Sequence, residues 1–400
     1  MNKKLIIPSV LGVVIVIGII VSIFSHHKIR FVLPPTNTPS TMVLPDTIEL
    51  KVYLENSGSM DAYMCAGSTL KDAVFDYISD VKKLTTTCDL YYINSKIIKQ
   101  NVSLENYIKE LTPQSFAQAG GDRGNTDLRA MFSQMLDDKT HHSNTVSIFI
   151  SDCILDIPQD AKDFFGNCQV SIKNTFNDAL TNNPTLGVQI VKLESTFDGY
   201  WYCGKNSKHL SNVKRPYYIW IIGDKDILAY INKNAPIGEV IHGIKEYCAY
   251  APIQDASYDI VDKDKPFVIN HTDCVDIQLL ANLSSTLQCD SLIRSIGQYN
   301  LSNPSQVTIT SISPITAAKS NYSHIINMVL SNPETLRSET ISFSYPYMAS
   351  WVENSNDETG DNIEENLDKT TGIKYLVKGV AEAYKNFNTC CKFSFDIMNR

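Results

Sequence analysis

Strand-type segments alternate with helix-type segments between residues 47 and 235, and this alternation limits the possible folds more than any other feature of the chain. Every second residue is apolar in 47–54, whereas the apolar residues of 70–81 recur at helical spacing. The later strand-type segments are 88–94, 145–152, 186–193 and 217–224. Because parallel strands need crossover connections, this order predicts a doubly wound, mostly parallel α/β sheet of the Rossmann-like type.

The remainder of the soluble chain differs in character from this region. Residues 196–215 are too long for a simple connection between two strands, and we interpret them as an insertion. Residues 236–352 contain short β-type segments with few helices, which predicts a smaller β-rich domain. Residues 353–368 contain seven acidic residues and no basic residue, as expected of a solvated linker. A final amphipathic helix is predicted at 373–387, so that residues 353–400 form an acidic linker and a C-terminal helix.

An uncharged apolar run occupies residues 5–25. At ~1.5 Å per residue, a helix of this length crosses a ~30 Å hydrocarbon layer, so the run predicts a single-pass transmembrane helix. A cleaved signal peptide is the alternative, although no small-residue cleavage site follows. Residues 26–46 form a Pro-rich linker. Basic residues flank the run on both sides, and the linker favours an extracytoplasmic location for the bulk of the chain.

Charge and cysteine content narrow the classes of function. The formal net charge of -8 argues against a nucleic-acid surface, which needs clustered Lys and Arg. The ten cysteines are even in number, which permits disulfides in an exported protein, but their spacing contains no C-x-x-C motif. An acidic chain of this kind can instead attract cations.

Hydroxyl and carboxylate side chains cluster at three points of the alternating pattern. Glu55, Ser57 and Ser59 directly follow the first strand, Thr126 precedes a helix, and Asp152 ends the strand-type segment TVSIFISD. In α/β sheets, ligands bind at the carboxyl ends of the strands. Hard cations such as Mg²⁺ take oxygen ligands at about 2.1 Å, which hydroxyl and carboxylate groups supply.

This pattern resembles the von Willebrand factor A-like (vWA) family over residues 47–235. The metal-ion-dependent adhesion site of that family is built from an Asp-x-Ser-x-Ser loop, a downstream Thr and a downstream Asp. The resemblance implies metal contacts from Ser57, Ser59, Thr126 and Asp152. Glu55 departs from the pattern because it stands where the family has Asp, and its extra methylene displaces the carboxylate by about a bond length.

The resemblance also implies a function. The site would hold Mg²⁺, or Mn²⁺ or Ca²⁺ in its place, and a carboxylate from a protein partner would complete the coordination of the ion. Adhesion or assembly, rather than catalysis, is the expected activity. One alternative is an envelope scaffold with a degenerate, metal-free vWA fold. Another is a metal-dependent hydrolase, although the chain contains no G-x-S-x-G, H-E-x-x-H or P-loop motif.

Overall fold

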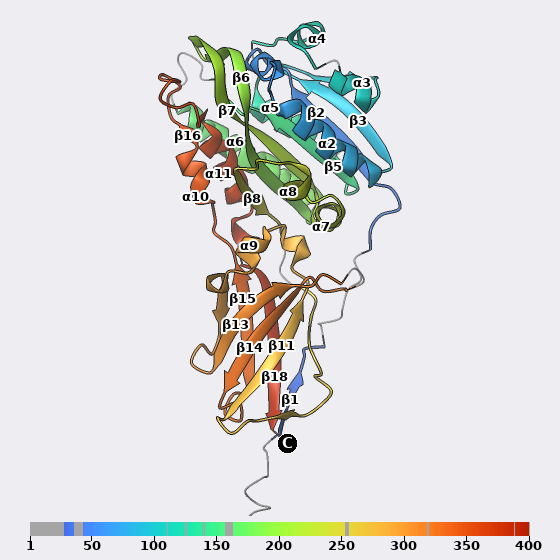
Figure 1. Cartoon of the computed structure of the whole chain (residues 1–400), viewed down its shortest axis with the longest axis vertical. Coiled ribbons are helices and arrows are strands. Elements are labelled where there is room, and N and C mark those ends of the chain that lie inside the picture. Colours follow the sequence, from blue (N-terminus) through green and yellow to red (C-terminus); the bar gives the residue numbers. More distant parts are fainter. Residues whose placement is uncertain are drawn as a thin grey trace, which may run out of the picture.

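The structure is a computed structural model that describes residues 28–35, 43–109, 111–124, 126–137, 139, 141–156, 163–252, 256–317, 320–387 and 389–399. The predicted transmembrane helix at 5–25 lies outside these residues. Within them, no helix has both the length and the apolar character needed to cross a membrane. The described chain forms an α/β unit and a β unit, which occupy the upper and lower parts of Figure 1.

A seven-stranded sheet forms the centre of the α/β unit, in the order β4-β3-β2-β5-β7-β6-β8. Its strands are β2 (Glu49–Glu55), β3 (Thr87–Ile93), β4 (Ile97–Gln100), β5 (Thr145–Ser151), β6 (Leu186–Cys203), β7 (Asn206–Asp224) and β8 (Glu246–Tyr250). β2 pairs in parallel with β3 and with β5, and the other four of the six pairings are antiparallel. The predicted doubly wound, mostly parallel sheet of the vWA type is therefore wrong.

The error arises from the segment that joins β6 to β7. Residues 196–215 are not an insertion but continue both strands as one long hairpin, in which Cys203 pairs with Asn206. Only Gly204 and Lys205 form the turn, and a two-residue connection can join only antiparallel strands. Gly204 has a φ of 58°, the left-handed conformation that such turns require. β7 consequently runs antiparallel to β5.

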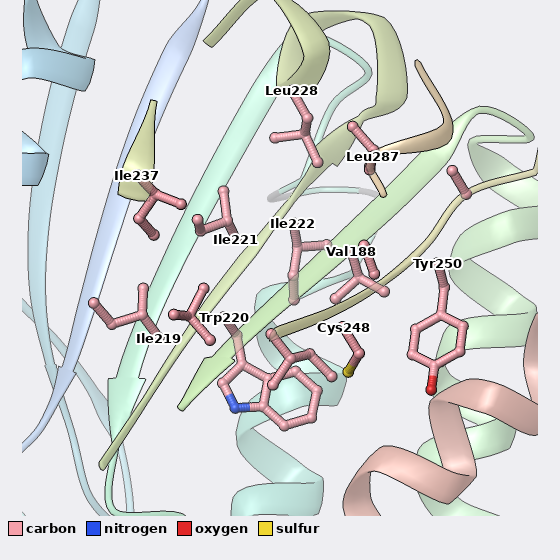
Figure 2. Packing of buried hydrophobic residues seen from close by; sticks show 14 of the residues in the cluster. Val188, Ile219, Trp220, Ile221, Ile222, Leu228, Ile237, Cys248, Tyr250 and Leu287 are labelled. Carbon is pink, nitrogen blue, oxygen red and sulfur yellow. The ribbon is translucent and has the colours of Figure 1, made fainter. Parts of the chain in front are cut away.

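Helices lie on both sides of this sheet (Figure 1). They are α2 (Leu70–Lys83), α3 (Leu104–Lys109), α4 (Pro113–Gln118), α5 (Leu128–Met135), α6 (Phe164–Asn182), α7 (Lys225–Asn234), α8 (Ile237–Val240) and α11 (Ile373–Ala383). The ring of Phe132 in α5 lies 5.2 Å from Phe149 and 5.0 Å from Trp220, centroid to centroid. Figure 2 shows Trp220 in this core with Val188 and Ile222, which are neighbours across β6 and β7. These buried side chains hold the helices on a rigid sheet.

The β unit consists of two antiparallel sheets, of strand order β10-β1-β18-β15-β12 and β13-β14-β11-β9. The strands are β1 (Lys28–Val32), β9 (Tyr258–Ile260), β10 (Phe267–Val268), β11 (Cys274–Ala281), β12 (Tyr299–Leu301), β13 (Val307–Pro314), β14 (His324–Ser331), β15 (Ser338–Ser344) and β18 (Thr389–Asn399). Alternate residues are buried along β14, so one face of its sheet belongs to the core. β1 pairs with β18, so this unit also takes strands from outside the predicted 236–352 domain.

The segment predicted as an acidic linker is packed against the α/β unit. Helix α10 (Ser350–Asn354) leads into β16 (Asn356–Asp357), which pairs in parallel with β17 (Thr370–Thr371). The buried Arg215 guanidinium donates to the carbonyls of Asn366, Leu367 and Lys369. Lys192 Nζ donates to Ser355 Oγ and to the carbonyl of Asp368. Backbone carbonyls of this acidic segment, together with Ser355 Oγ, thus accept the hydrogen bonds of the buried Arg215 and Lys192 side chains. The charge pattern of the sequence alone does not reveal these contacts.

Candidate metal site

A cavity of about 390 Å³ lies at the carboxyl ends of β2 and β5. All the predicted site residues line it: Glu55, Ser57, Ser59, Thr126 and Asp152. They come together because β2 and β5 pair in parallel, which brings the ends of both strands to one edge of the sheet. Their role as metal ligands stays a prediction, since proximity alone does not assign a ligand.

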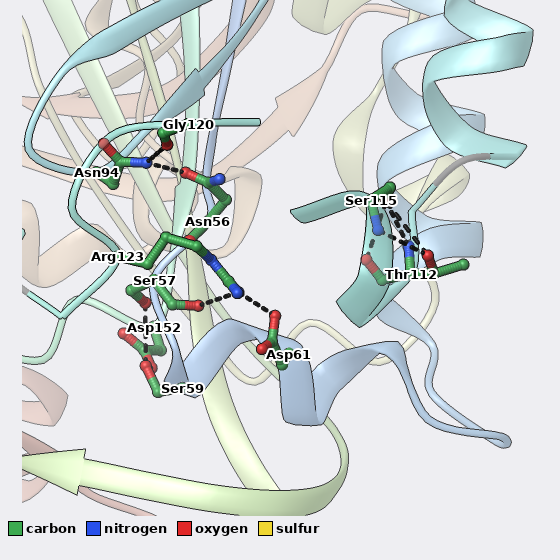
Figure 3. Close-up of polar contacts among 10 residues, drawn as sticks. All are labelled: Asn56, Ser57, Ser59, Asp61, Asn94, Thr112, Ser115, Gly120, Arg123 and Asp152. Atoms are coloured by element: carbon green, nitrogen blue, oxygen red, sulfur yellow. Dashed lines mark hydrogen bonds and ion pairs between the residues drawn. The ribbon is translucent and has the colours of Figure 1, made fainter. Parts of the chain in front are cut away.

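The two serines and the aspartate form a continuous polar chain. Ser57 Oγ lies 3.1 Å from Ser59 Oγ, and Ser59 Oγ donates to Asp152 Oδ2 at 2.7 Å (Figure 3). The other carboxylate oxygen, Asp152 Oδ1, accepts from the backbone N–H of Ile154 at 3.3 Å. Three oxygens from two distant segments are therefore held as close together as neighbouring ligands in one coordination sphere.

Glu55 and Thr126 complete the inner part of the cavity. Ser151 Oγ donates to Glu55 Oε2, and the backbone N–H of Cys153 donates to Ser151 Oγ at 2.7 Å. The longer Glu side chain is thus anchored by a hydroxyl of the neighbouring strand β5. Thr126 Oγ1 is buried near Glu55 and makes no hydrogen bond of normal geometry within the described residues. Its interaction with the Glu55 carboxyl opposes the rise in the pKa of that acid, so the hydroxyl lies beside the buried charge.

The electrostatics of the cavity are those of two buried acids. Burial and, second, the charge of Asp152 raise the pKa of Glu55 to about 8. Burial also raises the pKa of Asp152, against the opposing hydrogen bond from Ser59. Neither carboxylate forms an ion pair with a described basic side chain, whereas Asp61 at the rim pairs with Arg123. Buried like charges of this kind require a proton or a cation.

This arrangement predicts a pH dependence of stability in the metal-free protein. Glu55 and Asp152 have raised pKa values in the folded state, so their stabilising contribution is complete at low pH and is lost as the pH rises toward about 8. Burial lowers the pKa of His141 to about 4 and also lowers that of His324. These two histidines therefore reduce the stability of the folded state as the pH falls, but only at or below the ordinary histidine pKa of about 6.5. The melting temperature of chelator-treated protein is therefore expected to fall by about 5 °C between about pH 6.5 and 8.5. A flat profile in wild type, or an equal slope in Glu55→Gln, would contradict this assignment.

Arg123, which no sequence motif indicated, holds the loop that carries the two serines. Its Nε donates to the carbonyl of Asn56 at 2.9 Å, and its Nη2 donates to the carbonyl of Ser57 at 3.3 Å. The same guanidinium pairs with Asp61, and the backbone carbonyl of Arg123 accepts from Gly58 N–H at 3.1 Å. The only feature of the sequence that could have indicated this role is that Arg123 is the one basic residue in the loop AGGDRGNT.

A second contact joins the same two loops. Asn94 Nδ2 donates to Asn56 Oδ1 at 3.0 Å and to the carbonyl of Gly120 at 2.8 Å (Figure 3). The neighbouring Gly121 has a φ of 77°, and a Cβ there would lie 2.0 Å from Asn94 Oδ1. Only glycine fits this close approach. The loop that leads to Thr126 is therefore positioned by β2 and β3 together.

The ligand types at this site match a hard cation. Within the described part of the chain, no three His, Cys, Asp or Glu side chains gather in a metal-binding group. The cavity offers two buried carboxylates, Glu55 and Asp152, beside the hydroxyls, and the other two acids that line it, Asp61 and Asp156, are less buried. Mg²⁺, Mn²⁺ and Ca²⁺ bind to oxygen ligands of this kind, whereas Zn²⁺ is usually bound by Cys and His. The nine cysteines with described side chains are free thiols.

Comparison with known proteins adds no further assignment. The chain matches no protein-family model and no curated protein. The resemblance to the vWA family therefore depends on the motif residues alone, and the sheet around them departs from the expected topology.

Proposed function

We propose that this protein binds a divalent cation of the Mg²⁺, Mn²⁺ or Ca²⁺ class in the cavity at the ends of β2 and β5, and uses the ion to hold a protein partner. The observation that carries this proposal is the pair of buried carboxyls, Glu55 and Asp152, which lie among hydroxyls and form no ion pair with a described basic side chain. A cation compensates both charges at once, which explains why two acids occupy one buried site.

The ligands have distinct roles in this proposal. Ser57, Ser59 and Thr126 offer neutral hydroxyls, and Asp152 offers a carboxylate directly or through a water. Glu55, held by Ser151, contributes its charge directly or through a water. The cavity is large enough for a further group beside the ion, and a carboxylate is the anionic side chain that a protein partner can insert there. The activity is binding, and the proposal includes no reaction.

The cellular setting is part of the same proposal. Residues 5–25 would anchor the chain in a membrane as a single-pass helix, with the cation site on the extracytoplasmic side. The support is the uncharged apolar run itself, which ends shortly before β1 begins at Lys28.

Titration calorimetry of the full chain with Mg²⁺ and Mn²⁺ tests the cation site. We expect saturable binding by wild type and an affinity at least about tenfold lower, or ~1.4 kcal/mol, for Ser57→Ala with Ser59→Ala, because two oxygen ligands are lost. Ser311→Ala with Ser313→Ala is the matched control, since these serines have the same spacing and are exposed on β13. Absence of binding by wild type would support the metal-free scaffold, and turnover of simple esters would support the hydrolase.

A further inference from the structure

The outer part of the β6–β7 hairpin presents two aromatic rings to solvent. Tyr200 is 54% exposed and Tyr202 is 46% exposed, whereas Trp201 between them is buried. Among the strongly exposed large hydrophobic side chains of the described residues, these two are the aromatic ones. Their centroids lie 6.1 Å apart with an interplanar angle of 24°, so the two rings are nearly parallel neighbours, and we call this pair the tyrosine platform.

The tyrosine platform is rigid before any partner binds. Tyr200 pairs with His209 across the hairpin, and the His209 ring meets the Tyr200 ring edge-on at 5.0 Å. On the opposite face, Trp201 and Cys203 are buried. Asn206 Nδ2 near the turn donates to the carbonyl of Gly360 at 3.0 Å. Preorganised aromatic side chains lose little conformational entropy on binding, which makes them effective contact residues.

The platform continues into the proposed cation cavity. Tyr202 lines the cavity together with Ser57 and Asp152. A Cβ on Gly58 would lie 3.3 Å from Tyr202 Cε2, so the absence of a side chain at position 58 lets the ring approach the serine loop. Gly204 N–H also donates to Asp156 Oδ1, which ties the turn to the loop after β5. A ligand that enters the cavity therefore comes close to the Tyr202 side chain.

We propose that the tyrosine platform binds an aromatic side chain of a peptide segment, next to the acidic side chain that the same segment inserts toward the cation. This inference rests on the proposed function, because the cation selects the acid and the platform selects its neighbour. A carboxylate and an adjacent planar ring are the chemistry that matches the cavity and the two exposed tyrosines, since aromatic pairs contribute beyond the area that they bury.

The test uses the full chain loaded with Mn²⁺ and three blocked tetrapeptides: Ac-Gly-Asp-Trp-Gly-NH₂, Ac-Gly-Asp-Gly-Gly-NH₂ and Ac-Gly-Asn-Trp-Gly-NH₂. Water-proton relaxation reports Mn²⁺ binding, and paramagnetic broadening of peptide resonances reports peptide binding near the ion. We expect the Asp-Trp peptide to bind about fivefold or more tightly than the Asp-Gly peptide, and the Asn-Trp peptide to lose its broadening. Tyr202→Ala should remove the advantage of tryptophan, and Tyr202→Phe should keep it.

Two further variants separate the effect on the tryptophan preference from any effect on Mn²⁺ binding. Tyr200→Ala should weaken the tryptophan preference while Mn²⁺ binding stays normal, because Tyr200 is not among the residues that line the cavity. Tyr322→Ala, a half-buried tyrosine of the β unit, should change neither measurement. Loss of wild-type Mn²⁺ binding would overturn the proposed function. Normal Mn²⁺ binding with equal affinity for the two Asp peptides would overturn only this inference.

Discussion

Replacing Asp152 with asparagine is expected to lower the affinity for Mg²⁺ at least about 100-fold, or ~2.7 kcal/mol, by calorimetry. The Asp152 side chain is 1% exposed and accepts a 2.7 Å hydrogen bond from Ser59. A carboxylate at the protein surface therefore cannot take its place beside the ion. The same substitution should leave the metal-free protein as stable as wild type, or more stable, because Glu55 no longer faces a second buried charge. A loss of cation affinity without a loss of metal-free stability distinguishes a ligand from a structural residue.

Asp156→Asn is the matched control for this prediction. Asp156 also lines the cavity, but it is exposed and accepts a hydrogen bond from Gly204 N–H through Oδ1, which asparagine retains. We expect cation affinity within about twofold of wild type. At cation concentrations of about 100 times Kd, wild type should gain about 2.7 kcal/mol of stability, and Asp152→Asn should gain almost none. Equal thermal shifts in wild type and Asp152→Asn would remove Asp152 from the site.

Arg215→Met is expected to lower the free energy of unfolding by about 3–5 kcal/mol, because three backbone carbonyls lose their hydrogen bonds to a charged donor. Arg215 is 1% exposed, and its Nη1 lies 2.8 to 3.0 Å from three carbonyl oxygens of residues 366–369. Methionine fills part of the volume but donates no hydrogen bond, so these carbonyls lose a donor at once. Chemical denaturation measures the loss.

Limited proteolysis locates the effect of Arg215→Met. Residues 358–369 should become susceptible in the variant before the rest of the α/β unit, because Arg215 holds their backbone against β7. Lys208→Met provides the control, since the Lys208–Glu364 ion pair joins the same segment to β7 but lies at the surface. We expect it to cost less than about 1 kcal/mol. If both variants unfold at the same denaturant concentration, Arg215 is not the anchor of this segment.

Local patterns in the sequence were informative where one segment determines its own conformation. The predicted strands at 88–94 and 145–152 correspond to β3 and β5, and the apolar spacing at 70–81 falls within α2. The order of polar residues after these strands was also visible before folding. Such features depend on periodicity and on neighbouring residues, which a linear chain displays directly.

The direction of a buried strand is not encoded in the same way. The apolar run 217–224 fits a parallel or an antiparallel neighbour equally well, and only the two-residue turn at Gly204 and Lys205 makes β7 antiparallel. The same applies to β8, whose place beside β6 depends on a partner more than 50 residues away. The fold class was therefore predicted incorrectly although most strands of the α/β unit were located.

The sequence by itself determined that hydroxyl and carboxylate side chains follow two of the predicted strands and that Thr126 precedes a helix. Tertiary structure alone decided three contacts: the hydrogen bond from Ser151 to Glu55, the hydrogen bond from Arg123 to the serine loop, and the close approach of the Tyr202 ring to Gly58. The physical reason is that each of these contacts joins segments separated by tens of residues or more. Their geometry depends on strand pairing and on packing around the whole sheet, which no local pattern specifies.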